Sequence, residues 1–227
     1  MKKHKNIFSF EGRNTIRMAI AGGSGVGKTT VVTNMLKNEL YEVYDDLYLC
    51  HPEYDFEPPD ENWNTIELKR SHIFKEFNED LVKQLVAFTK RKFLRYRKKG
   101  KDYKACLILD DCVSDEQFSN KQRTEIGKAF TNSRKSGLSI IIITQKTSLL
   151  SQQILSNCNV IVLFNSGFGK ELRTIEDSWG FADRHKWRAF CQSQYKDFRD
   201  TILIDVDRKK YYRNFEEVTF NPEKNIN

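Results

Sequence analysis

The stretch IRMAIAGGSGVGKTTVV, residues 16–32, constrains the fold more than any other part of the sequence. It carries Gly22, Gly27, Lys28 and Thr29 in the spacing G-x-x-x-x-G-K-[ST], which is typical of a phosphate-binding loop. Glycines let the backbone wrap so that several N–H groups point at one anion, and the following helix adds its positive N-terminal end. An apolar run precedes the loop and a helical pattern follows it, so a chance glycine-rich turn is disfavoured and a strand–loop–helix unit is predicted.

The loop predicts a nucleotide site with ATP and Mg²⁺ as its ligands. Lys28 would reach the β and γ phosphates, and the Thr29 hydroxyl would bind Mg²⁺. The residues predicted to surround the phosphates are Gly22, Gly23, Ser24, Gly25, Val26, Gly27, Lys28, Thr29 and Thr30.

Apolar strands and amphipathic helices alternate along the rest of the chain. Strands are predicted over residues 15–22, 45–52, 65–68, 105–111, 138–145 and 158–164, with a closing hairpin over 201–207 and 209–215. Helices are predicted over residues 29–40, 72–96, the later part of 116–137, 148–157, 169–179 and 183–195. Continuous apolar strands are typical of a mostly parallel sheet that is covered on both faces. The pattern therefore predicts an α/β fold of the three-layer P-loop NTPase type (ASCE or RecA-like).

Length and composition fit that fold and exclude several others. The 227 residues suit a single domain, with an arm over 1–13, the core over 14–180 and a C-terminal helix and hairpin over 181–227. No long apolar run or signal-peptide core is present, so no membrane partner is expected. Five cysteines without a C-x-x-C pair favour buried thiols, notably Cys106, Cys112 and Cys158, in a reducing compartment. A net charge of +7 permits a polyanionic partner without proving one.

Two acids end the apolar run ACLILDD. Asp110 is predicted to hold the Mg²⁺ shell from the carboxyl end of its strand. Asp111 could accept a proton from an attacking water, a group that an ATP-hydrolysing machine needs and a small-molecule kinase does not. The plainer alternative is that Asp111 caps a turn or helix.

Two further candidates flank the strand LSIIIITQ. Gln145 ends this strand and could orient water or sense the γ-phosphate, or it could simply reach solvent. Arg134 ends the preceding helix, where a cation is favoured by the helix dipole, or it could serve a neighbouring subunit's ATP. We expect Arg134 near a domain edge and close to the Gln145 strand.

The order of these motifs resembles a known family. AGGSGVGKTT, LILDDC, FTNSRKSGLSIIIITQ and ILSNCNVIVLF, within residues 14–180, are similar to the DNA-packaging ATPases of large DNA viruses and virophages. That group includes the poxvirus-type enzyme and belongs to the FtsK–HerA class of translocases. The phosphate loop is shared by many NTPases, so the joined run from the Asp-Asp strand onward carries the specific part of the resemblance.

The resemblance implies an ATPase that drives double-stranded DNA into a preformed viral capsid, at its portal or a vertex. It implies a homo-oligomeric ring, a pentamer or hexamer, in the host cytoplasm or a viral factory, or associated with the virion. It implies that Lys28 and Thr29 bind ATP and Mg²⁺, that Asp110 and Asp111 serve the metal and the water, that Gln145 is a sensor and that Arg134 acts in trans. Cellular members usually carry Glu as the second acid, and the shorter Asp111 departs from that pattern.

The DNA contacts and the competing functions stay open at this level. The run KRKFLRYRKKGK, residues 90–101, interleaves Phe93 and Tyr96 with basic residues and suits sequence-independent phosphate binding. It could equally be a solvated helix end whose aromatic rings face the core. A P-loop nucleotide or nucleoside kinase, and a nucleotide-gated adaptor that does not hydrolyse ATP, are the alternative functions.

Overall fold

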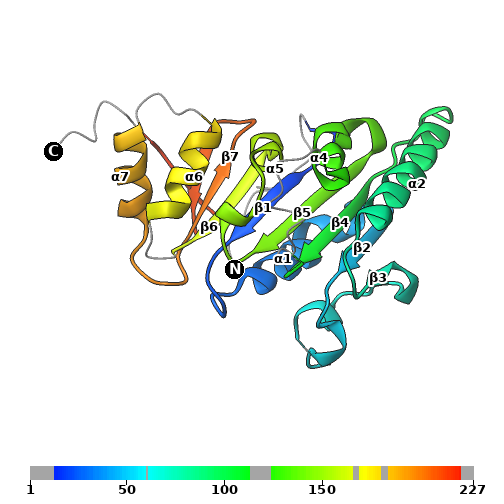
Figure 1. Ribbon diagram of the computed structural model, residues 1–227, viewed down its shortest axis with the longest axis horizontal. Coiled ribbons are helices and arrows are strands. Elements are labelled where there is room, and N and C mark those ends of the chain that lie inside the picture. Colours follow the sequence, from blue (N-terminus) through cyan, green and yellow to red (C-terminus); the bar gives the residue numbers. More distant parts are fainter. Residues whose placement is uncertain (1–12, 60, 113–123, 166–168, 180–183, 221–227) are drawn as a thin grey trace.

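The computed structural model describes residues 13–59, 61–112, 124–165, 169–179 and 184–220 (Figure 1). Within them the strands form one nine-stranded sheet in the order β3-β2-β4-β5-β1-β6-β7-β8-β9. The strands from β3 to β6 in this order are parallel, and the β6–β7, β7–β8 and β8–β9 pairs are antiparallel. The strands are β1 Arg17–Ala21, β2 Asp46–Cys50, β3 Ile73–Phe74, β4 Ala105–Asp110, β5 Leu138–Thr144, β6 Val160–Phe164, β7 Thr201–Asp205, β8 Lys210–Arg213 and β9 Glu216–Val218.

Helices cover both faces of this sheet. Of the helices in the described ranges, five lie on one face, in front in Figure 1, and α1 lies on the other. The helices are α1 Lys28–Met35, α2 Glu79–Arg97, α4 Glu125–Ser136, α5 Gln152–Asn157, α6 Gly169–Trp179 and α7 Arg184–Gln194. A π-helical turn, Leu36–Leu40, continues α1. The predicted α/β class, with a mostly parallel and two-sided sheet, is confirmed.

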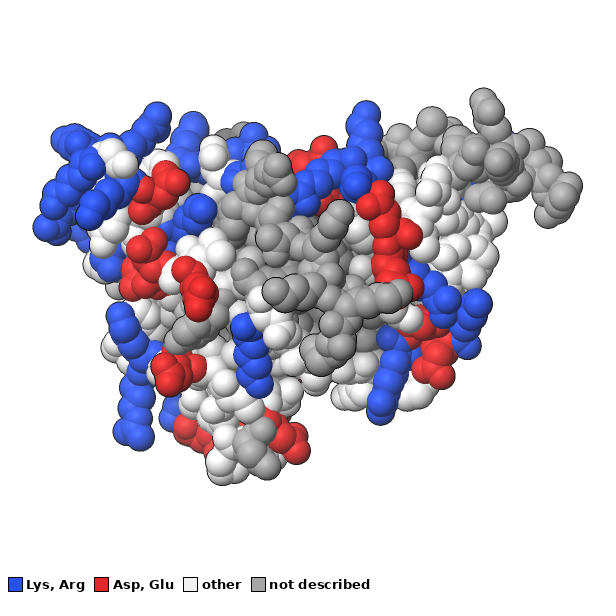
Figure 2. All heavy atoms as spheres, turned by 180° about the vertical axis from the view of Figure 1, so that it is seen from behind, with Lys and Arg blue, Asp and Glu red and all other residues white. Residues whose placement is uncertain are grey.

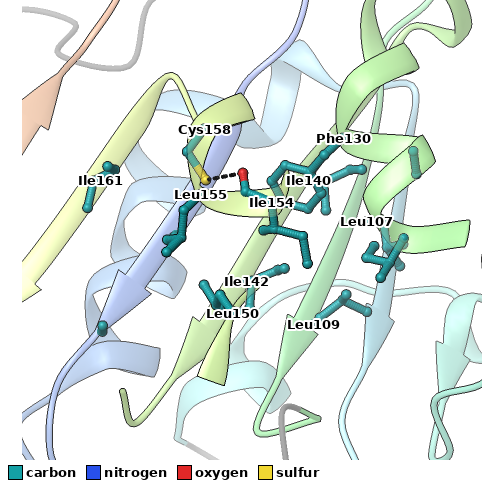
Figure 3. Packing of buried hydrophobic residues seen from close by; sticks show 14 of the residues in the cluster. Leu107, Leu109, Phe130, Ile140, Ile142, Leu150, Ile154, Leu155, Cys158 and Ile161 are labelled. Atoms are coloured by element: carbon teal, nitrogen blue, oxygen red, sulfur yellow. Dashed lines mark hydrogen bonds between the residues drawn. The ribbon is translucent and has the colours of Figure 1, made fainter. Parts of the chain in front are cut away.

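The alternation of side chains along each strand explains why the central strands carry apolar residues on both faces. Ile140 and Ile142 of β5 pack against the helices in front, whereas Ile141 and Ile143 point to the opposite layer. Figure 3 shows Ile140 and Ile142 beneath Phe130 of α4 and the residues of α5. Every residue of β5 is buried, as expected for a central strand covered on both sides.

Two predictions about the second quarter of the chain are wrong. Residues 65–68 form no strand, because Thr65 closes a 3₁₀ turn that begins at Asn62. The edge strand lies at Ile73–Phe74, inside the region predicted as helix, and pairs with the end of β2. The helix α2 starts only at Glu79, because Asn78 is extended and its side chain accepts the Leu81 N–H at 2.7 Å.

Other differences are small. The closing hairpin forms as predicted, but the chain adds a third antiparallel strand, β9, which the sequence pattern did not indicate. The five cysteines are all buried free thiols, as predicted for three of them. None of the helices in the described ranges combines the length and the hydropathy that a membrane span requires.

Candidate functional site

The phosphate loop connects β1 to α1 at the carboxyl edge of the sheet. Gly25 and Gly27 have φ of 73° and 100°, which side-chain-bearing L-residues rarely adopt. Gly22 is required for another reason, since a Cβ there would lie 2.6 Å from the Cβ of Phe164 on β6. The glycines therefore allow both the tight turn and its close approach to the neighbouring strand.

Lys28, the first residue of α1, lies over this loop. Its side chain is folded back so that Nζ donates to the Gly23 carbonyl at 2.7 Å, and the residue is only 8% exposed. Burial lowers the pKa of Lys28, while the negative charges of Asp111 and Asp110 act in the opposite direction. The ammonium group is thus held beside the loop with two carboxylates nearby, where an anionic phosphate would be its natural partner.

Thr29 and Asp110 meet across the site. The Thr29 hydroxyl donates to Oδ2 of Asp110 at 3.0 Å. Adjacent ligands of an octahedral Mg²⁺, each 2.0–2.1 Å from the ion, lie about 2.9 Å apart. The two oxygens therefore have both the chemistry and the spacing that Mg²⁺ requires, and this pair fits the predicted metal site.

Asp110 is fixed by groups from a segment that follows β2. Trp63, which is fully buried, donates its indole N–H to Oδ2 of Asp110 at 2.7 Å. Nδ1 of His51 lies 3.3 Å from the Asp110 carbonyl oxygen, and because a carbonyl only accepts, Nδ1 is the donor. Burial raises the pKa of Asp110, and the Trp63 hydrogen bond and the proximity of His51 oppose this shift.

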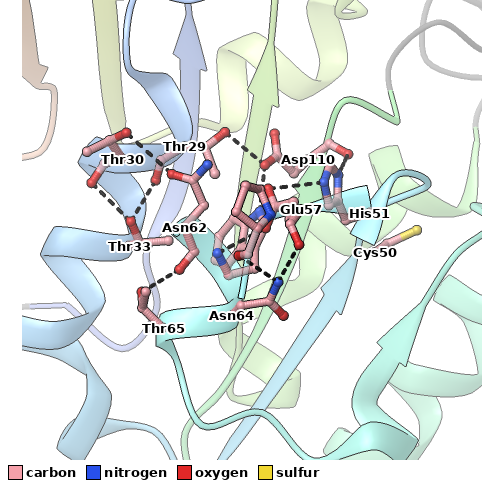
Figure 4. Close-up of polar contacts among 12 residues, drawn as sticks. Thr29, Thr30, Thr33, Cys50, His51, Glu57, Asn62, Asn64, Thr65 and Asp110 are labelled. Carbon is pink, nitrogen blue, oxygen red and sulfur yellow. Dashed lines mark hydrogen bonds and ion pairs between the residues drawn. The ribbon is translucent and has the colours of Figure 1, made fainter. Parts of the chain in front are cut away.

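This segment, residues 51–59 and 61–66, covers the site and is called the cover segment below. It crosses from β2 to the start of α1, where the Thr30 hydroxyl donates to Oδ1 of Asn62 at 3.4 Å (Figure 4). Between the cover segment and the phosphate loop lies a cavity of about 390 Å³. Its walls are Ser24, Gly25, Gly27, Lys28, Thr29, Thr30, His51, Glu53, Phe56, Glu57, Pro58, Asn62, Asp110 and Asp111.

Sequence reasoning assigned no role at the site to the cover segment and so missed its contribution. His51, Glu57, Asn62 and Trp63 all lie at the site, either on the cavity wall or directly behind it. Two signals could have pointed to them. Trp63 is a large apolar residue in an otherwise polar stretch, and His51 immediately follows a buried strand at the edge where the phosphate loop also lies.

Asp111 and Gln145 lie at the same edge as the phosphate loop. Asp111 has a left-handed backbone, φ 52°, is exposed and lines the cavity. Gln145 directly follows β5, which lies between β1 and β4. The residue before it, Thr144, touches the phosphate loop, because its carbonyl accepts from the Gly22 N–H at 3.3 Å. Gln145 is exposed and is not part of the cavity wall, although its position next to the loop is as predicted.

Arg134 lies at the opposite edge of the sheet. It belongs to the last turn of α4, which runs antiparallel to β5, so it adjoins the beginning of that strand. The seven residues of β5 separate it from Gln145, which corresponds to about 20 Å. Its charge lowers the pKa of Arg17 at the start of β1, after the larger effect of burial. Arg134 therefore cannot reach the phosphates bound by its own subunit.

The basic run 90–101 also ends at this amino edge. Its aromatic residues belong to the core, since Phe93 packs beside Gly137 and the Tyr96 ring lies 5.3 Å from that of Tyr103. Lys92 is half-buried and pairs with Asp46, whereas the other charged side chains are solvent-exposed, namely Lys90, Arg91, Arg95, Arg97, Lys98, Lys99 and Lys101. Figure 2 shows Lys and Arg gathered over this end of α2, at the upper left. The aromatic rings face the core, as the second interpretation predicts, and phosphate binding by the exposed charges stays a prediction.

The comparison with protein families decides the family. The sequence profile described as "Poxvirus A32 protein" matches residues 8–171, which is more than two thirds of the chain. The chain belongs to the poxvirus A32 protein family. The profile spans the phosphate loop, both aspartates, Arg134 and Gln145. A comparison with curated proteins gives no match.

Solved structures show the same fold for this A32 family member. B204, the DNA-packaging ATPase of Sulfolobus turreted icosahedral virus, has a TM-score of 0.62 at 16% identity, covering 88% of this chain and 96% of B204. The genome packaging NTPase B204 of Sulfolobus turreted icosahedral virus 2, in complex with ATP-gammaS, gives 0.60 at 19% identity, with 88% and 96% covered. ATPases 2 and 3 of EccC from Thermomonospora curvata give 0.53 at 10% identity, covering 94% of this chain and 38% of that chain.

Proposed function

We propose that this chain is an ATP-hydrolysing motor that translocates double-stranded DNA into a viral capsid during genome packaging. The observation that carries the proposal is the contact between Thr29 and Asp110 beneath a complete phosphate loop, in a chain of the poxvirus A32 family. The fold shared with B204, whose name states DNA packaging and whose structures hold nucleotides, supports it.

The chain's own residues account for nucleotide binding. The backbone of residues 22–27 and the Lys28 ammonium would hold the phosphates, and Thr29 and Asp110 would hold Mg²⁺. When bound, the metal would supply positive charge that neutralises the negative charge developing during phosphoryl transfer. Trp63 keeps the Asp110 carboxylate in place, because its indole N–H donates to Oδ2, the same oxygen that accepts from the Thr29 hydroxyl. Asp111 and Gln145 stand at the same edge, where they would meet the attacking water and the γ-phosphate.

The two edges of the sheet suggest how subunits work together. Arg134 is exposed at the amino edge, whereas the phosphate loop is at the carboxyl edge. An arginine supplied by a neighbouring subunit would complete the phosphate site, and its planar guanidinium binds phosphate oxygens bidentately. We therefore assign Arg134 a role in trans, within a homo-oligomeric ring. The exposed charges of residues 90–101 supply a sequence-independent contact to the DNA backbone.

A hydrolysis assay with the purified chain tests the proposal. Lys28→Ala should abolish productive ATP binding, because the charge on the β and γ phosphates is lost. Long duplex DNA should stimulate ATP turnover by the wild type, whereas nucleosides should not. Stimulation by a nucleoside would indicate a kinase, and ATP binding without turnover would indicate a nucleotide-gated adaptor.

The ring itself is tested by mixing two inactive variants. Arg134→Ala should bind ATP nearly normally but hydrolyse it about 10³-fold more slowly, as for other arginine fingers. Mixing it with Lys28→Ala subunits should restore part of the activity, because some interfaces then pair an intact loop with an intact arginine. No recovery despite proven co-assembly would refute the role in trans. The setting in which such a motor works is a virus-infected cell, in the cytoplasm or a viral factory.

A further inference from the structure

The cavity contains a carboxylate that the phosphate-loop motifs do not include. Glu57, in the cover segment, lines the same cavity as Lys28, Thr29 and Asp110. Its side chain is 13% exposed, so the carboxylate is largely withdrawn from bulk water and yet open to the cavity. A carboxylate in such a position requires specific partners, because an isolated buried charge is unfavourable.

Two contacts hold this carboxylate in one orientation. The Trp63 backbone N–H donates to Oε2 of Glu57 at 3.1 Å, and Nε2 of His51 lies 3.4 Å from Oε1. Both residues also contact Asp110 (Figure 4). The Trp63 indole N–H donates to the Asp110 carboxylate, and Nδ1 of His51 donates to the Asp110 backbone carbonyl. Glu57 and the predicted metal ligand Asp110 are therefore positioned by the same two residues.

The carboxylate still has capacity for a water molecule. An ionised carboxylate offers about four acceptor sites, and the Trp63 N–H uses one of them. Burial raises the pKa of Glu57, and the Trp63 N–H and the proximity of His51 oppose that shift while Asp110 adds to it. A raised pKa brings a carboxylate closer to the strength that general-base catalysis favours at neutral pH.

Asp111 is less suited to that task. Within the described residues, no hydrogen bond holds its carboxylate, its side chain is exposed, and its backbone is left-handed at φ 52°. Its side chain is also one methylene shorter than glutamate. Catalytic groups contribute most when their position is fixed before the reaction. By this criterion Glu57 is the better-organised acid at the site.

We propose that Glu57 is the catalytic base that orients and deprotonates the water attacking the γ-phosphate of ATP. In this step the proton of the water moves to a Glu57 oxygen while the water oxygen forms a bond to the γ-phosphorus. The bond between that phosphorus and the β,γ-bridging oxygen breaks, and its electron pair leaves with ADP. The inference rests on the ATP hydrolysis proposed above and names the residue that performs it.

The test separates binding from chemistry in Glu57→Gln. This variant keeps the size of the side chain and an oxygen that can accept from Trp63, but it cannot take the proton. Equilibrium binding of ATP should stay within about threefold of the wild type, while single-turnover hydrolysis falls by about 10²–10⁴-fold. Bound nucleotide recovered after acid quench should then be ATP instead of ADP. Glu61→Gln, an exposed residue of the same segment outside the cavity wall, is the matched control and should behave as wild type.

Two further variants keep the test decisive. Asp111→Asn should slow hydrolysis by less than about tenfold if Glu57 is the base. Glu57→Ala with added formate should regain part of the rate, because a small carboxylate can occupy the vacated space; a merely structural role predicts no such rescue. If the wild type hydrolyses ATP and Glu57→Gln does so at the same rate, this inference alone is overturned. The same holds if formate gives no rescue in a Glu57→Ala variant that still binds ATP. A wild type that binds ATP and never converts it would overturn the proposed function, and this inference with it.

Discussion

The buried hydrogen bond between Trp63 and Asp110 gives a quantitative prediction. Trp63→Phe removes the indole N–H that donates to Oδ2 at 2.7 Å, in a place where the tryptophan is fully buried and Asp110 is 3% exposed. A hydrogen bond to a charged group contributes about 1.5–3 kcal/mol, and a new cavity of at least methyl size costs about 1 kcal/mol. We therefore expect Trp63→Phe to lower the free energy of unfolding by about 3 kcal/mol.

A double-mutant cycle in urea isolates the hydrogen bond from the change in volume. Trp63→Phe, Asp110→Ala and the double variant should give a coupling energy of about 1.5 kcal/mol or more. Trp187→Phe is the matched control, because it is also fully buried but packs in the opposite layer. Its combination with Asp110→Ala should be additive within about 0.5 kcal/mol. Additivity for Trp63 as well would refute the claim that this indole fixes the Asp110 carboxylate.

Three further predictions concern the surface, the fold and pH. Neutralising Lys98, Lys99 and Lys101 together should weaken DNA binding without a change in sequence preference, and each lost phosphate contact should reduce the log–log salt slope by about 0.9; an unchanged slope in salt titrations would exclude this cluster. Gly137→Ala should lower the urea midpoint, since φ is 63° and the left-handed backbone alone costs about 1–2 kcal/mol. Hydrogen bonds, foremost from the Asn214 side chain, hold the pKa of Asp200 well below its ordinary value. The contribution of Asp200 to the free energy of unfolding is therefore complete above its pKa in the unfolded chain, and it declines as pH falls through its pKa in the folded protein. Asp200→Asn should therefore be destabilised at pH 7, and its difference from the wild type in denaturation experiments should shrink below about pH 4.

The central sheet was predictable because its residues are under one dominant constraint. The strands β1, β4, β5 and β6 are buried along their whole length and mostly apolar, since both faces are covered, and a glycine or polar residue follows the end of each. The end of α4 was equally clear, because Gly137 alone there can take the left-handed conformation without strain. In these places the local signal and the tertiary environment agree.

The cover segment and the start of α2 were not predictable by the same reasoning. Ile73 and Phe77 repeat at a helical spacing with the residues of α2, so periodicity extended the helix past the true start, which Asn78 fixes through its side chain. The position of Glu57 depends on Trp63, which in turn is fixed by a carboxylate 47 positions further along the chain. No local pattern encodes such a contact.

The separation of Arg134 from the phosphate loop has a consequence for assembly. If the arginine acts in trans, the amino edge of one sheet must face the carboxyl edge of the next, which is a heterologous, head-to-tail interface. A two-fold dimer could not form it symmetrically, and a single subunit would have no complete site at all. An open arc would always have one complete ATP site fewer than it has subunits. Only a closed ring would have as many complete sites as subunits. ATP turnover per subunit would then depend on protein concentration, and hydrolysis would report that the ring had assembled before any DNA was moved.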